Sequence, residues 1–150
     1  MSLMDAVLLT PLRRIPVPRG DVFHAIKASD EGFAGFGEAY FTTVDHGAVK
    51  GWKRHRRMTM NLIVPSGAVE FVLGDDSAGG GAPSFRSITL SPASDESYAR
   101  LTVPPGLWMG FSGRGEGLNL VLNFASIPHD PEEAENRQLD SFAWDWSTAA

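Results

Sequence analysis

The chain has 150 residues, of which 43% are hydrophobic and 21% are charged, and it contains no cysteine. This length suits one domain with a sizeable core, and the lack of cysteine excludes a disulfide scaffold and thiolate chemistry. The net charge of -5 argues against a nucleic-acid partner, and no apolar run approaches the roughly 20 residues of a membrane span. We expect one cytoplasmic domain over residues 1–150 with no membrane partner, residues 1–3 being an expression remnant.

Short strand-like segments, separated by turns rich in Gly and Pro, follow one another along most of the chain. After them, the segment 129–137, HDPEEAENR, predicts a short C-terminal helix with Asp130 at its N-cap and Pro131 at its first position. This order predicts an all-β jelly-roll β-sandwich, with an immunoglobulin-like sandwich as the alternative. The predicted strands are 21–27, 36–44, 47–55, 58–65, 68–74, 85–90, 98–103, 106–112 and 118–125.

The stretch 50–57, KGWKRHRR, gathers five basic side chains and a histidine in an acidic protein. An exposed strand edge is one explanation, because charge on such an edge discourages aggregation. An anion-binding strand is the other, since arginine and lysine both bind phosphate. Strand alternation, with a possible kink at Gly51, would place these side chains on two faces. One face would carry Lys53, His55 and Arg57, and the other Lys50, Arg54 and Arg56.

The spacing around this stretch fits a pattern of cupin jelly rolls, namely Gly, five residues, His-x-His, three or four residues, Glu, six residues, Gly. It fits at Gly47, at Lys53 to His55, at Met60 and at Gly67. A second cupin pattern, Pro-x-Gly with His three positions on, fits Pro104 to Gly106 and Met109. The chain therefore resembles the cupins.

In that resemblance the four metal-ligand positions hold Lys53, His55, Met60 and Met109. Divalent metals in such barrels need imidazole and carboxylate ligands, which an ammonium group and two thioethers do not replace. We therefore expect neither a metal nor another cofactor.

Two segments carry a narrower resemblance. Residues 35–55, GFGEAYFTTVDHGAVKGWKRH, are similar to the dTDP-4-dehydrorhamnose 3,5-epimerase family, and residues 103–135 are similar to the related dTDP-sugar 3,4-ketoisomerases. Both are metal-free cupins of carbohydrate biosynthesis that transfer protons next to the C4 ketone of a nucleotide-linked sugar. The resemblance implies a dTDP-4-keto-6-deoxyhexose epimerase or isomerase, with a nucleotide-diphosphate sugar as its partner, acting as a homodimer.

The resemblance also implies the site residues. Lys53 stands where the epimerases have their histidine base, His55 matches the second histidine of the ketoisomerases, and strand 118–125 lacks the family's tyrosine. We expect His55, Lys53 and Tyr40 to be catalytic, with Lys53 acting either as an uncharged base or as a cation beside the ketone. The expected substrate-binding residues are Lys50, Arg54, Arg57, Asn61, Trp108 and Asn119. The alternative is a non-catalytic cupin that binds a nucleotide sugar or another anionic carbohydrate.

Overall fold

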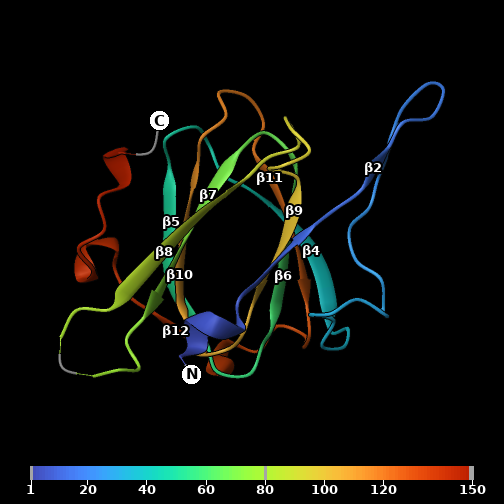
Figure 1. The fold of residues 1–150 in the computed structure, drawn as a ribbon. Helices are drawn as coiled ribbons and strands as arrows, with labels where there is room; N and C mark the ends of the chain where they lie inside the picture. The colour runs from blue at the N-terminus through green and yellow to red at the C-terminus, as the bar shows by residue number, and fades with distance from the viewer. Residues whose placement is uncertain (1, 80, 149–150) are drawn as a thin grey trace.

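Two five-stranded antiparallel sheets pack face to face in the computed structural model, which describes residues 2–79 and 81–148 (Figure 1). The strand order is β1-β9-β6-β11-β4 in the first sheet and β12-β5-β10-β7-β8 in the second, and β2 and β3 form a separate hairpin. This arrangement agrees with the predicted jelly-roll sandwich. The strands are β1 Leu8–Pro11, β2 Arg14–Ile15, β3 Val22–Phe23, β4 Glu38–Thr43, β5 Val49–His55, β6 Met60–Ser66, β7 Val69–Asp75, β8 Ser84–Leu90, β9 Ala99–Val103, β10 Trp108–Gly113, β11 Leu120–Ala125 and β12 Ala134–Asn136.

The helical elements are single 3-10 turns: η1 Leu3–Ala6, η2 Pro131–Glu133, η3 Leu139–Ser141 and η4 Trp146–Thr148. The predicted C-terminal helix is therefore wrong in extent, although its start is correct. Asp130 caps η2 by accepting a hydrogen bond from the Glu132 backbone N–H at 3.0 Å, and Pro131 is its first residue. The chain then extends into β12, whose backbone pairs with the edge of β5 instead of with itself.

Each predicted strand overlaps an observed one, but of the predicted strand 21–27 only the two residues of β3 are in a strand. Strands β1, β2 and β12 were not predicted. These strands are only two to four residues long. So short a segment does not show a period of two, and only its partner strand defines it. No helix among the described residues is long and apolar enough to cross a membrane.

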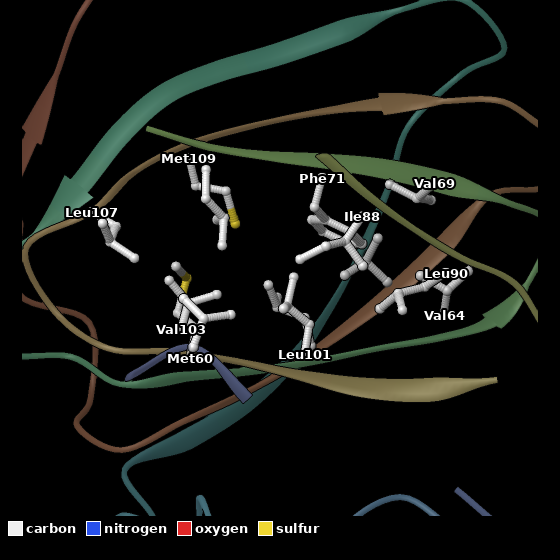
Figure 2. Packing of buried hydrophobic residues seen from close by; sticks show 14 of the residues in the cluster. Met60, Val64, Val69, Phe71, Ile88, Leu90, Leu101, Val103, Leu107 and Met109 are labelled. Carbon is white, nitrogen blue, oxygen red and sulfur yellow. The ribbon is translucent and has the colours of Figure 1, made fainter. Parts of the chain in front are cut away.

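The main hydrophobic core fills the space between the two sheets. Figure 2 shows Met109 and Phe71 reaching into this space from one sheet and Met60 and Leu101 from the other. Phe71 and Leu101 are fully buried. Burying side chains of this size contributes roughly 1.5–3 kcal/mol each, and the two methionines mark the end of the core where it opens into a cavity.

A second apolar cluster covers the outer face of the β5 sheet. Its buried members are Trp52, Val72 and Trp108. The C-terminal segment packs over them through Phe142 and Trp146, which appears in Figure 1 as the red chain running outside β5 and β8. The inner face of β5 is thereby left for the cavity.

Candidate active site

A cavity of about 370 Å³ opens between the two sheets, within the size range of small-molecule sites. Its floor is apolar, and its polar groups come from β4, β5, β11 and β12. The lining residues that carry polar side chains are Tyr40, Thr42, Lys50, Lys53, His55, Asn123 and Asn136. The structure therefore brings together all three residues predicted to be catalytic and one of the six predicted to bind substrate.

A β-bulge places both lysines in this cavity. Lys53 pairs with Met109 and Lys50 with Phe111, so that two residues of β5 face the single Gly110 of β10. The extra residue shifts the alternation, and Lys50 lies on the same face as Lys53 rather than on the opposite one. Gly51 permits this close approach, since its φ is +155° and a Cβ there would lie 2.7 Å from the Gly110 Cα.

His55 lies at the end of β5, buried, with Nδ1 hydrogen-bonded to the Oε1 of Glu133. Glu133 comes from η2, which β12 holds against the edge of β5. Nδ1 is therefore occupied, and Nε2 has no hydrogen-bond partner within the part of the chain that the structure describes. A carboxylate that holds one imidazole nitrogen fixes the tautomer in which the other nitrogen accepts a proton.

Glu133 is itself held firmly. Its Oε2 accepts hydrogen bonds from the backbone N–H groups of Arg56, Arg57 and Met58 at 3.2, 3.1 and 3.3 Å. Burial acts to raise the pKa of Glu133, but the hydrogen bond to His55, the backbone donors of Arg57 and Met58 and the charge of His55 outweigh it, and the pKa lies below its ordinary value. The carboxylate of Glu133 is thus ionised beside the imidazole. The sequence analysis did not identify Glu133 as a partner of His55.

Tyr40 and Asn123 form the opposite wall. They are direct register partners on β4 and β11, and the Asn123 Nδ2 donates a hydrogen bond to the Tyr40 hydroxyl at 3.1 Å. Strand 118–125 lacks the tyrosine of the family, and Tyr40 on the neighbouring strand β4 supplies a phenol beside Asn123 instead.

The two cavity lysines differ in their contacts. The Lys50 Nζ donates to the Thr43 carbonyl at 2.7 Å. Lys53 has neither an ion pair nor a hydrogen bond from its side chain to any residue that the structure describes. Its charge is therefore available to an anionic ligand at the mouth of the cavity.

The predicted binding role of Arg54 and Arg57 disagrees with their positions. Arg54 points to the outer face of β5, where it pairs with Asp76 at 3.2 Å and Glu135 at 2.9 Å and lies over the Trp108 ring at 4.5 Å. Arg57 pairs at the surface with Asp130 at 3.1 Å. Carboxylates of 130–135 thus neutralise these arginines. Both charged segments are visible in the sequence, but the spacing of the motifs does not indicate that they pair.

The other three predicted binding residues are also structural in this chain. Trp108 is fully buried in the outer cluster, where its Nε1 donates to Asp76 at 3.0 Å and no base can stack on its ring. Asn61 alternates to the outer side of β6 and bonds to Arg100 and Thr102. Asn119 ties together loop backbones through four hydrogen bonds.

The four cupin ligand positions, Lys53, His55, Met60 and Met109, all line the cavity, which supports the register taken from the spacing. They do not form a metal-ligand set, because only the imidazole among them is an ordinary ligand for a divalent cation. No group of three or more His, Asp or Glu side chains suited to a metal occurs among the described residues.

Comparison with known proteins identifies the family. The chain is 33% identical to a dTDP-sugar isomerase from Desulfovibrio desulfuricans G20, with a TM-score of 0.90 over 100% of this chain and 96% of that one. The chain belongs to this family of dTDP-sugar isomerases, as its sequence predicts. It matches no protein-family model and no curated protein.

More distant structures share the fold. A sugar 3,4-ketoisomerase from Thermoanaerobacterium thermosaccharolyticum, in complex with TDP, is 22% identical with a TM-score of 0.71 over 89% of each chain. A dTDP-4-dehydrorhamnose 3,5-epimerase from Sulfolobus tokodaii is 18% identical with a TM-score of 0.75, covering 92% of this chain and 80% of that one. The cupin jelly roll is thereby confirmed over nearly the whole chain.

Proposed function

We propose that this protein is a metal-independent epimerase or isomerase of a dTDP-4-keto-6-deoxyhexose. The observation that carries the proposal is His55 at the wall of the cavity with Glu133 behind it, in a chain of the dTDP-sugar isomerase family. A base of this kind removes the acidic proton from a carbon next to a ketone. The pairing of the imidazole with an ionised carboxylate favours an enzyme over a non-catalytic binding cupin.

Each polar group of the cavity has a role in this reaction. Nε2 of His55 takes the proton from the carbon beside C4, and Glu133 stabilises the imidazolium that forms. Because Glu133 supports His55 as the base, Lys53 is assigned as the cation, and no anion among the described residues competes for it. It attracts the diphosphate or the developing enolate oxygen. Tyr40 donates a proton from the opposite wall.

Nuclear magnetic resonance in deuterated buffer tests the activity. Incubation of the protein with dTDP-4-keto-6-deoxyglucose is expected to replace the proton at C3 or C5 with deuterium and to give an isomeric keto sugar. Calorimetry with dTDP distinguishes the enzyme from a non-catalytic cupin. A protein that binds dTDP but exchanges no proton of several dTDP-4-keto sugars would be a non-catalytic cupin. The absence of both binding and exchange would refute both functions.

Lys53→Met is expected to weaken dTDP binding about 10- to 150-fold, because it removes a charge-assisted contact worth roughly 1.5–3 kcal/mol. Isothermal titration at two salt concentrations measures the loss, and the salt dependence should decrease with it. The matched control is Arg57→Met, which removes the same charge from the same stretch but at a site paired with Asp130. A larger loss in the control than in Lys53→Met would place the diphosphate outside the cavity.

We further propose that the protein acts in the cytoplasm as a homodimer. Strand β4 is an edge strand of the first sheet, and Phe41 on it and Phe36 before it are 64% and 63% exposed. An apolar, unpaired edge favours pairing with a second copy of the chain. Sedimentation velocity should show a dimer that Phe41→Glu converts to a monomer. A wild-type monomer at micromolar concentration would contradict the proposal.

A further inference from the structure

Asn123 occupies a position where the sandwich ordinarily places an apolar residue. Along β11 the inward side chains are Val121, Asn123 and Ala125, and the first and last of these belong to the main core. Asn123 is only 2% exposed. Asparagine is disfavoured in strands, and a buried amide is costly unless its hydrogen bonds are made. Its position at the cavity wall, opposite His55, suggests a reason for it in the chemistry of the site.

The hydrogen bonds of Asn123 are incomplete. Its Nδ2 donates to the Tyr40 hydroxyl at 3.1 Å, whereas its Oδ1 is buried and has no partner among the described residues. Buried acceptors are nearly always satisfied, so an unpaired one calls for an explanation. The residue lines the cavity, and a donor brought by a bound ligand would complete its hydrogen bonds.

The direction of the bond to Tyr40 matters as well. An amide nitrogen can only donate, so the Tyr40 oxygen is the acceptor, and its own proton is directed elsewhere. No acceptor for that proton lies among the described residues. The wall therefore presents a hydroxyl donor beside an amide acceptor. An α-hydroxyketone presents the complement, a carbonyl acceptor beside a hydroxyl donor.

We propose that Asn123 is the positioning residue that makes Tyr40 a proton donor, and that its Oδ1 selects substrates with a hydroxyl group on the carbon next to the ketone. This inference rests on the proposed function and specifies its substrate class. As His55 takes the proton from the hydroxyl-bearing carbon, the electrons of the C–H bond form a C=C bond. The carbonyl electrons move onto the oxygen, which takes the proton of Tyr40. The products of this step are an enediol, an imidazolium and a phenolate, to which the Asn123 Nδ2 donates. If the imidazolium then protonates the former carbonyl carbon while the phenolate takes the proton of the neighbouring hydroxyl, the isomeric ketone forms and both residues are restored without a further reactant.

Asn123→Asp tests the direction of the bond. The carboxylate accepts the Tyr40 proton and so withholds it from the substrate, while it still accepts the substrate hydroxyl. We expect kcat to fall about 100-fold, as for loss of a general acid, with KM little changed. Tyr40→Phe should cost the same, and the double variant no more than either. Asn123→Leu, of similar size, loses the acceptor too and should also raise KM. Equal kcat in Asn123→Asp and the wild type, or multiplicative losses in the double variant, would overturn the inference.

Two measurements distinguish failure of the positioning role of Asn123 from failure of the proposed function. The side-chain amide signals of ¹⁵N-labelled protein report the contact without any substrate: Tyr40→Phe should shift an Asn123 amide proton upfield. Tyr98→Phe should leave it in place, because the Tyr98 hydroxyl donates to the His24 carbonyl instead. An unshifted signal in Tyr40→Phe would overturn the positioning role even if the enzyme is active. Absence of turnover in the wild type, with thermal unfolding showing a folded protein, would refute the proposed function and the catalytic part of the inference together.

Discussion

His55→Asn is expected to abolish deuterium exchange into a dTDP-4-keto sugar, lowering its rate at least about 100-fold, the lower limit for loss of a general base. Asparagine keeps a similar size but cannot take up a proton. Because the ring of His55 lies at the cavity wall and bonds only through Nδ1 among the described residues, the fold should persist. The measurement is the loss of the C3 or C5 proton signal with time, at a protein concentration high enough to detect slow residual exchange.

His129→Asn is the matched control for this substitution. His129 is exposed before η2 and lies outside the cavity, so its replacement should leave the exchange rate within about twofold of the wild type, as for surface substitutions generally. Binding of dTDP should be similar in both variants, which separates loss of chemistry from loss of substrate. Wild-type exchange in His55→Asn would show that another group is the base, and Lys53 would then be the first to examine.

Glu133→Gln should reduce both activity and stability. The amide offers a single acceptor oxygen where the carboxylate has two, which serve three backbone N–H groups and the His55 ring. Each buried donor left unsatisfied costs about 1–3 kcal/mol, so the free energy of unfolding at pH 7 should fall by at least that amount. The amide also cannot stabilise an imidazolium, and kcat should fall more than KM rises.

The pH dependence of stability provides the check on Glu133. Its pKa in the folded protein lies below the ordinary value of 4.5. A lowered pKa means that the folded state binds the proton more weakly than the unfolded state does, so the stabilisation is complete above pH 4.5 and is lost as the pH falls through the folded pKa. The difference in unfolding free energy between wild type and Glu133→Gln should therefore be greatest near neutrality and shrink in acid. A difference that stays constant or grows below pH 4.5 would contradict this role.

Much of the fold follows from the sequence because its strands are long enough to alternate and are separated by Pro-Gly turns. The same alternation correctly places Lys53 and His55 on one face of β5. It fails at Lys50, since the bulge opposite Gly110 depends on the pairing of β5 with β10, which is a tertiary feature. It also fails for the residues after His55, where β5 ends and Arg57 turns to the surface.

The part of the site that sequence reasoning missed is Glu133. Its segment, with Pro131 at a helix start and acidic residues after it, indicates a helix, and a helical Glu133 would have no fixed relation to His55. The signal that was available is charge complementarity, since residues 130–135 include four carboxylates and residues 50–57 include three arginines. In the structure Glu135 pairs with Arg54 and Arg56, and Asp130 pairs with Arg57. The concentration of positive charge in the basic stretch thus serves largely to bind this segment, and only Lys50 and Lys53 of its five basic side chains face the cavity.

The structure of His55→Asn with dTDP-4-keto-6-deoxyglucose bound would show where the substrate lies relative to the proposed base, because the substitution should preserve binding while stopping turnover. We expect the keto sugar in the cavity between the sheets, with the carbon beside its ketone against the residue 55 side chain, its carbonyl oxygen near the Tyr40 hydroxyl and its diphosphate next to Lys53. A ligand bound instead against Arg57 and Asp130 on the outer surface, with the cavity left to solvent, would contradict this expectation.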